Sequence, residues 1–544
     1  MQTAEVKKMK MNEEELLQRA AEEREQIFKR YDLGTDPSNE VYPWENPSFE
    51  VYHRTDKFGF IHDSRLPDTL DVYEIKQTKI EIERDKKWMR MMSKWDQNSE
   101  KLRRRVYKGI PNKIRWVAWK KLLKVDEAMS NNPGIYSTML KYARLYSTET
   151  RQIDSDVNRQ FRENIAFRER YSLKQKSLFN ILNAYSIYNS ELGYCQGMSS
   201  LAAVFLLYMD EEESFWALNS LMIDTKYAMH GLFIEGFPKL TRLLEHHDRI
   251  IKKIMRDLHA HFIKHNVDSI LYSIKWFFCI FVERIPFSLC LRVWDAYLLD
   301  GERVVIAMAV TVLMLHKKDL LQLKDMDSII EYLQVKLYKN FSYPDDIVMN
   351  AVEQVMRKLM SKKLDSPPAP KVNETPTRPL GNFVEPDFER KIGRRRSTFT
   401  ENERQTFENV ISRQESNALE IQSNTSIENS EYAVGDPFSL KTYRSFNSLT
   451  TSISVSTLSL NSGGNNNVKV PNSKCNSNLT EKHNSIDNNI KIANDNAEQN
   501  QIQIIQNKND NVVVVNVTQP HENNIEIHYD NIEDSSLEEE NTRL

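Results

Sequence analysis

The chain has 544 residues, of which 40% are hydrophobic, and this composition suits one large core with an extensive polar remainder. Its 74 basic and 77 acidic residues give a formal net charge of −3, which argues against a basic nucleic-acid-binding protein. The four cysteines have no paired or CxxC spacing, which argues against a disulfide or zinc framework and for a reducing compartment.

Features that direct a chain into or across a membrane are not evident in the sequence. The N-terminal residues contain no apolar segment of the kind found in signal peptides. The longest apolar run, 304–315, is shorter than the ~20 residues that a membrane span requires. We therefore expect a cytoplasmic protein whose contact with membranes is peripheral.

Residues 1–102 predict a helical extension with an arm. Residues 12–31 alternate acidic and basic side chains around an apolar stripe, which is typical of an amphipathic helix. A loop rich in Pro, Gly and Asn follows over 32–47, and the aromatic segment 55–62 is expected to fold onto the main domain. Residues 74–96 again carry apolar side chains at helical spacing.

Residues 103–362 predict one large all-α domain. A sharp turn at 109–111 precedes the first helical pattern, and the acidic residues at 210–213 suit the first turn of a helix. The apolar patterns at 276–291 and 304–315 indicate central, buried helices. Because the sequence lacks clear strand alternation and hairpin signals, we expect a single multi-helix fold.

The composition changes after residue 362, and residues 363–544 predict a long disordered tail. The segment 366–380 contains five prolines and reads as a linker that could bind an SH3 domain, and residues 402–544 are rich in Asn and Ser and lack Trp. The basic cluster 394–396 precedes Ser397, which suggests a kinase site or a contact with anionic lipid. An ordinary charged cluster in a disordered chain is the alternative.

Three short segments stand out in the helical region: Ile153–Arg159, Gly193–Met198 and Leu291–Asp295. Taken singly, each has a simple structural explanation. Arg159 could be one solvated arginine among several, Gln196 could be a loop residue beside a turn glycine, and Asp295 could cap a helix or pair with Arg292.

Together, these segments form an ordered set. They follow Gly109-Ile110-Pro111, Arg115 and Trp119, and they read Ile-x-x-Asp-x-x-Arg, Tyr-Cys-Gln-Gly and Arg-Val-Trp-Asp. This set resembles the TBC domain of Rab GTPase-activating proteins over roughly residues 103–330. The upstream segments, including 55–62, look most similar to the RN-tre branch of that family.

The resemblance implies an activator of Rab GTPases rather than an enzyme with its own nucleotide. Arg159 matches the arginine finger and Gln196 the glutamine finger, and the GTP and Mg²⁺ would be carried by the GTP-bound Rab partner. The matching positions that support the fingers are Asp156, Tyr194, Gly197, Arg115, Trp294 and Asp295. The resemblance also implies a role in vesicle traffic and endocytosis, with peripheral attachment to endosomal or Golgi membranes.

The residue types suit this chemistry. A guanidinium group is always charged, and its fork of donors matches the geometry of phosphate oxygens. A glutamine amide has a donor and an acceptor, so Gln196 can orient the attacking water and contact the γ-phosphate. Gly197 leaves room for close backbone approach beside it.

Other features of the sequence could suggest different sites. Gly231 and Gly236 have phosphate-loop spacing, but Phe-Pro follows them in place of Lys-Ser or Lys-Thr. The histidines around 246–265 are expected to be solvated rather than metal ligands. Two rival functions remain: a non-catalytic Rab-binding scaffold or effector, and a cysteine hydrolase centred on Cys195.

Overall fold

The computed structural model describes residues 13–42, 44–45, 53–65, 72–93, 95, 99–386, 388–392, 401 and 404–413. The basic cluster with Ser397 and the chain from 414 onward lie outside these residues. The expected disorder of that part of the tail therefore stays a prediction.

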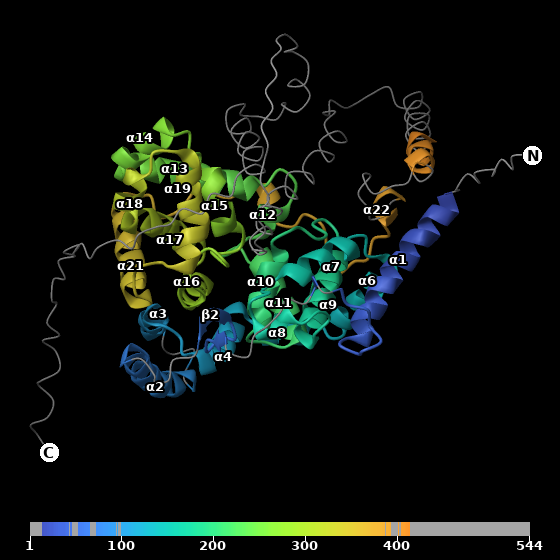
Figure 1. The fold of residues 1–544 in the computed structure, drawn as a ribbon, viewed down its shortest axis with the longest axis horizontal. Helices are drawn as coiled ribbons and strands as arrows, with labels where there is room; N and C mark the ends of the chain where they lie inside the picture. Colours follow the sequence, from blue (N-terminus) through green and yellow to red (C-terminus); the bar gives the residue numbers. More distant parts are fainter. Residues whose placement is uncertain are drawn as a thin grey trace, which may run out of the picture. The chain divides into compact units, whose positions relative to one another are not determined.

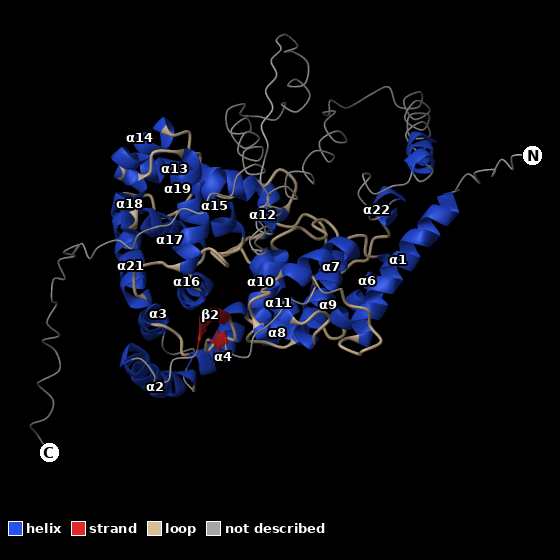
Figure 2. Cartoon of the chain, in the orientation of Figure 1, coloured by secondary structure: helices blue, strands red, loops and turns tan. Residues whose placement is uncertain are grey.

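The described part of the chain is built almost entirely from helices, which confirms the predicted all-α class (Figure 2). One antiparallel hairpin departs from it: β1 (His53–Thr55) pairs with β2 (Ile61–Arg65). Its turn forms because the Asp56 carboxylate accepts hydrogen bonds from the backbone N–H groups of Phe58 and Phe60, each at 2.9 Å. This hairpin lies in the N-terminal arm, upstream of the predicted helical domain 103–362.

The first half of the domain is organised around one buried helix, α9 (Leu173–Tyr188), which packs against α6, α7, α10 and α11 (Figure 1). The second half of α9, residues 181–188, is buried on all sides, including the polar Asn183 and Ser186. The other helices of this half are α1 (Glu13–Leu33), α2 (Val72–Met92), α3 (Ser99–Lys108), α4 (Asn112–Leu123), α5 (Val125–Asn131), α6 (Ile135–Tyr146), α7 (Thr150–Arg159), α8 (Ile165–Arg168), α10 (Met198–Leu206) and α11 (Glu211–Ile223).

The second half is organised around α17 (Glu302–Leu315), which packs against α13, α15, α16 and α21. The predicted burial of 304–315 is confirmed, since nearly every side chain of α17 is buried. No helix in the described ranges is long and apolar enough to cross a bilayer. The other helices of this half are α12 (His230–Phe233), α13 (Pro238–Ile254), α14 (Arg256–Lys264), α15 (Ser269–Phe278), α16 (Phe287–Asp300), α18 (Lys317–Gln322), α19 (Met326–Glu331), the π-helix η2 (Tyr332–Lys336), α20 (Leu337–Lys339) and α21 (Asp345–Ser361).

The N-terminal extension is packed on the helical domain. Helix α1 contacts α6 and α7, and the ring of Tyr31 stacks on Phe179 of α9 with centroids 3.9 Å apart. The β1–β2 arm is anchored by Phe60, whose ring lies 4.6 Å from that of Phe287 on α16. The expected docking of the aromatic arm is therefore confirmed.

The segment predicted to be a proline-rich linker instead packs on the domain. Its short 3-10 helix η3 (Val372–Glu374) places Glu374 in a fully buried position, where the carboxylate lies 2.6 Å from the guanidinium of Arg242. Further along, the N–H of Gly381 donates to the Tyr188 carbonyl, and Phe383 stacks on Tyr142. The proline content of this segment predicted a linker, but a few specific contacts hold it on the domain. Helix α22 (Phe388–Ile392) follows.

Candidate functional site

Helix α7 presents Arg159 at its last position. Ile153 and Val157 are fully buried and face the core together with Asp156, as residues three and four apart on a helix do. The side chain of Arg159 is 28% exposed, so it reaches the surface, whereas the opposite face of α7 is packed against the core. This arrangement gives a partly exposed arginine side chain on a helix whose opposite face is buried.

Asp156 lies at the centre of the polar contacts of the site. Its side chain is 1% exposed, and its Oδ1 lies 2.7 Å from Nη2 of Arg159. The same carboxylate accepts hydrogen bonds from Gln152 Nε2 at 2.9 Å and from the Tyr194 hydroxyl at 2.5 Å. Burial raises the pKa of Asp156, and the neighbouring Arg159 and Tyr194 oppose this shift. One buried acid thus orients the predicted arginine finger and the segment that carries Gln196.

The Tyr194–Gly197 loop is shaped by two glycines with positive φ angles. At Gly193 (φ +63°) a Cβ atom would lie 3.2 Å from the Glu149 carboxylate at the start of α7, so the loop approaches that helix closely. Gly197 (φ +105°) begins α10 in a left-handed conformation that side chains disfavour. Between them Tyr194 is anchored to Asp156, and Gln196 lies partly exposed in the turn two residues later.

The remaining supporting residues form a buried polar centre that joins α4 to α16. Nε of Arg115 donates to Oδ1 of Asp295 at 3.1 Å, and the indole N–H of Trp119 donates to the same oxygen at 2.8 Å. The rings of Trp119 and Trp294 stack 5.7 Å apart. These residues are buried, so they stabilise the packing behind the site and do not form part of a docking surface.

The suggested pairing of Asp295 with Arg292 is wrong. Asp295 pairs with Arg115, whereas Nη1 of Arg292 lies 2.7 Å from Oδ1 of Asp346 on α21. Both side chains lie on the same face of α16, as residues three apart on a helix do, but Asp295 reaches Arg115 on α4 whereas Arg292 reaches the Tyr107 carbonyl and Asp346 at the start of α21.

The prediction of one helix over 276–291 is wrong in its middle: residues 279–285 form a loop between α15 and α16 that connects this centre to the Gln196 segment. The indole N–H of Trp294 donates to the Ile280 carbonyl at 3.1 Å, and the Cys279 thiol lies 4.0 Å from the carbonyl oxygen of Gly197. Ile280, Phe281 and Glu283 all have positive φ angles, a conformation that costs energy for side chains of this size. The loop is therefore held in shape by α16.

Lys275 is a second residue missed by the sequence. It lies on α15 one turn before Cys279, on the side of the helix that approaches Gly197. Burial and the nearby Arg284 lower its pKa to about 8, and Arg159 contributes in the same direction. The only signal in the sequence was a single charge within the apolar segment 269–278.

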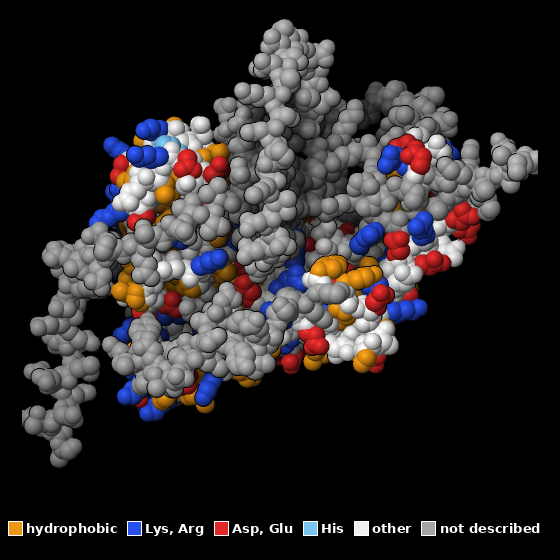
Figure 3. All heavy atoms as spheres, viewed as in Figure 1, with side chains coloured by type: hydrophobic (Ala, Val, Ile, Leu, Met, Phe, Trp, Pro, Cys, Tyr) orange, Lys and Arg blue, Asp and Glu red, His pale blue; other side chains and the backbone are white. Residues whose placement is uncertain are grey.

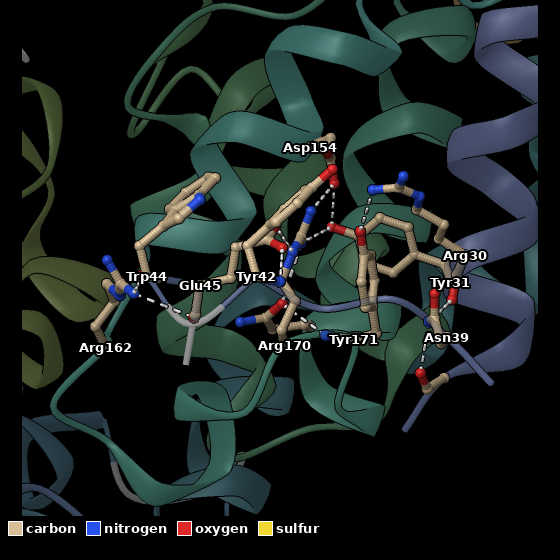
Figure 4. A network of polar contacts seen from close by, with 12 residues as sticks. Arg30, Tyr31, Asn39, Tyr42, Trp44, Glu45, Asp154, Arg162, Arg170 and Tyr171 are labelled. Carbon is tan, nitrogen blue, oxygen red and sulfur yellow. Dashed lines mark hydrogen bonds and ion pairs between the residues drawn. The ribbon is translucent and has the colours of Figure 1, made fainter. Parts of the chain in front are cut away.

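The N-terminal extension braces α7 through a polar network (Figure 4). Nη2 of Arg170 donates to Asp154 on α7 at 2.6 Å, Nη1 donates to the Tyr31 hydroxyl at 2.9 Å, and Nε donates to Glu45 at 3.0 Å. The Tyr31 hydroxyl in turn donates to Asp154 at 2.8 Å. Asp154 and Asp156 thus anchor opposite sides of the same helix.

The structure argues against a reactive cysteine at position 195. Burial raises the pKa of the Cys195 thiol to about 12, which disfavours a reactive thiolate.

Two of the histidines suggested as metal ligands lie inside the domain. His246 is hydrogen-bonded to the Leu364 carbonyl and His247 to the Tyr272 hydroxyl, and both are buried, so the expectation of solvated histidines is wrong for these two. In the described part of the chain no group of three or more His, Cys, Asp or Glu residues is arranged to hold a metal ion. Gly231 packs against Glu374, where a Cβ atom would lie 2.8 Å from that side chain.

Comparisons with known proteins agree with the motifs. The family profile of the Rab-GTPase-TBC domain matches residues 112–321. The proteins named TBC1 domain family member 10B of Mus musculus and of Homo sapiens are each 31% identical over 264 residues. That match covers 48% of this chain and 32% of each relative, about a third of its length.

A solved Chlamydomonas flagellar RabGAP TBC domain is 20% identical, with a TM-score of 0.46 over 55% of this chain and 99% of that domain. The comparisons do not single out the RN-tre branch, which stays a prediction. On the motifs and the profile match, the region from 112 to 321 is a Rab-GTPase-TBC domain.

Proposed function

We propose that this protein accelerates GTP hydrolysis by a Rab-type small GTPase, with Arg159 and Gln196 entering the nucleotide site of the partner. The observation that carries the proposal is the shared carboxylate of Asp156, which holds Arg159 at 2.7 Å and Tyr194 at 2.5 Å. A buried acid that orients an accessible arginine and a glutamine-bearing loop is what a site completed in trans requires.

The proposed role of Arg159 follows from the charge that develops during hydrolysis. Negative charge builds on the phosphoryl oxygens during hydrolysis, and an arginine supplied in trans raises the rate by ~10³–10⁵, or about 4–7 kcal/mol of barrier. Gln196 would orient the attacking water, while GTP and Mg²⁺ stay on the partner.

Single-turnover GTP hydrolysis over a panel of GTP-loaded Rab proteins tests the proposal. Arg159→Ala and Arg159→Lys are both expected to lose most of the acceleration, since lysine lacks the donor fork. Gln196→Ala is expected to lose acceleration while still binding the GTP-bound partner. Equal rates for the wild type and all three variants would reject the assignment.

A non-catalytic Rab-binding scaffold is the alternative, and affinity measured beside turnover separates the two. Tight binding to a GTP-loaded Rab with no gain in rate would favour the scaffold. We place the activity at endosomal or Golgi membranes in endocytic traffic, with any SH3 or kinase contacts made by the tail. The Rab that is accelerated would be identified by the same panel.

A further inference from the structure

Residues 366–386 run along the helical domain between α21 and α22 (Figure 1), and we refer to them as the strap. The first anchor of the strap is Glu374 in η3, which is fully buried and pairs with Arg242 on α13. Glu302 completes this cluster, because its carboxylate lies 3.0 Å from Lys239 and 3.4 Å from Arg242. Removing Glu374 would leave buried positive charge without its partner, so this end of the strap is firmly held.

The second anchor of the strap is Glu191, in the loop between α9 and α10. Its carboxylate accepts a hydrogen bond from the Thr377 hydroxyl at 2.7 Å. It also accepts from the backbone N–H groups of Thr377 at 2.8 Å and Arg378 at 3.1 Å. Because Thr377 is exposed, this anchor lies at the surface, whereas Glu374 does not. The attachment of the second half of the strap, 377–386, therefore depends on an accessible threonine.

The Glu191 loop leads directly into the segment that carries Gln196. The N–H of Gly193, two residues after Glu191, donates to the Asn189 carbonyl at 2.8 Å. At Gly193 the loop also approaches the Glu149 carboxylate at the start of α7. A displacement of Glu191 would therefore reach both the start of the arginine-bearing helix and the turn that holds Gln196, through an unbroken set of contacts.

The surroundings of Glu191 offer little positive charge to a second anion. In the part of the chain that the structure describes, the one side chain within ion-pair distance of Glu191 is His230, at 4.0 Å. Burial lowers the pKa of His230, although Glu191 opposes the shift, so this histidine is neutral near neutral pH. Arg378 lies on the strap itself, so pairing between Arg378 and a new anion on the strap would not tie the strap to the loop. A second anion at this anchor would repel Glu191.

We propose that Thr377 is a phosphorylation site, and that its modification releases residues 377–386 from the Glu191 loop and lowers GTPase acceleration. The hydroxyl oxygen of Thr377 attacks the γ-phosphorus of ATP in a protein kinase and forms a new O–P bond. The bond from that phosphorus to the bridging oxygen breaks, ADP leaves, and the hydroxyl proton passes to the catalytic base of the kinase. The regulation rests on the proposed function, whereas the release of the strap does not.

The chemistry of the product explains the release. A phosphothreonine carries about −1.5 to −2 charges near neutral pH and no longer has the hydroxyl donor that binds Glu191. Two anions then share one anchor, and the backbone N–H groups alone oppose their repulsion. Residues 375–379 form neither helix nor strand, so a kinase could bind this stretch without unfolding a regular element.

Hydrogen exchange followed by mass spectrometry tests the release without any GTPase. The full chain is prepared with phosphothreonine at position 377. The amides of Arg378 and Gly381 are hydrogen-bonded to Glu191 and to the Tyr188 carbonyl, so peptides covering 377–386 should exchange at least about tenfold faster. Peptides covering 366–374 should be unchanged, since Glu374 keeps its buried partners. Unchanged exchange over 377–386 would overturn the proposal.

Two comparisons isolate like-charge repulsion as the cause. Phosphoserine at the exposed Ser137 of α6 adds the same charge elsewhere and should leave exchange of the strap unchanged. Figure 3 shows acidic and basic side chains interspersed on the visible described surface, so one further anion there is not expected to disturb the domain. Glu191→Gln keeps an acceptor but removes the charge, so phosphorylation should accelerate exchange less in this variant than in the wild type. An equal effect in both would overturn the mechanism.

Single-turnover GTP hydrolysis, with a Rab that the wild type accelerates, tests the regulation. Phosphorylation of Thr377 should lower the acceleration about tenfold or more, because a positioning error of about 1 Å can cost a hundredfold. The form phosphorylated at Ser137 should keep its acceleration. Faster exchange of the strap with undiminished acceleration would overturn the regulation. A wild type that accelerates no Rab would instead reject the proposed function and the regulation with it, and exchange alone would then decide the release.

Phosphopeptide mapping shows whether the site is used. The protein is isolated from its own cells with phosphatases inhibited, and phosphate is expected on Thr377. Thr377 found there only in its unmodified form would overturn the assignment of the site.

Discussion

Replacement of Asp156 by asparagine tests how the site is oriented. The change keeps the shape of the side chain and removes its charge. Nη2 of Arg159, now 2.7 Å from a carboxylate oxygen, would face a neutral amide instead. A hydrogen bond to a charged group contributes about 1.5–3 kcal/mol, so the single-turnover rate should fall roughly 10- to 150-fold if the contact aligns Arg159 for catalysis. This loss is smaller than that expected for Arg159→Ala.

The fold should survive this replacement, because the Tyr194 hydroxyl can accept from the new amide instead of donating to a carboxylate. Asp126→Asn is a matched control, since it removes an exposed acid that pairs with Lys120 on the surface. The double variant with Arg159→Ala should lose less than the sum of the two single losses, because part of the effect of Asp156 acts through the arginine and the rest through Tyr194. An unchanged rate for Asp156→Asn, or losses that simply add in the double variant, would refute this account.

Three further predictions concern the surroundings of the site. Cys195→Ser should retain GTPase acceleration, because burial raises the pKa of this thiol to about 12; turnover and thiol labelling of the native protein check it. Gly197→Ala should lower the thermal midpoint by the equivalent of about 1–3 kcal/mol and slow hydrolysis, since φ is +105° there. The free energy of unfolding should decrease as the pH falls from 6.5 toward 3, by about 1.4 kcal/mol per pH unit for His247, because burial lowers its pKa to about 3 and only the unfolded state then binds the proton. Chemical denaturation of His247→Gln should show a flatter pH profile.

The sequence was sufficient for the helical class and for the segments that form the site. The apolar run at 304–315 predicts α17, because a run of this length is longer than most buried strands. The motif around Arg159 and that around Gln196 lie 37 positions apart in the chain and meet at Asp156 in the structure. Their contact could be expected only from the resemblance to TBC domains.

Contacts between distant segments could not be read from local patterns. Asp295 pairs with Arg115, 180 residues away, although Arg292 is a nearer candidate in the sequence. Glu374 is buried against Arg242, 132 residues away, inside a segment whose prolines suggested a linker. Such pairings depend on how the folded helices are oriented toward each other. Helix propensity and amino-acid composition do not predict that orientation.

Both segments that carry the proposed fingers are held by parts of the chain outside 112–321. From the N-terminal side, Tyr31 of α1 joins Arg170 in binding Asp154 on the arginine-bearing helix. From the C-terminal side, the backbone N–H of Thr377 donates to Glu191 at 2.8 Å, five residues before Gln196. A positioning error of about 1 Å can cost a hundredfold in rate. The functional unit is therefore expected to be larger than the region that the family profile matches, because the precision of its site depends on contacts that begin with α1 and end beyond η3.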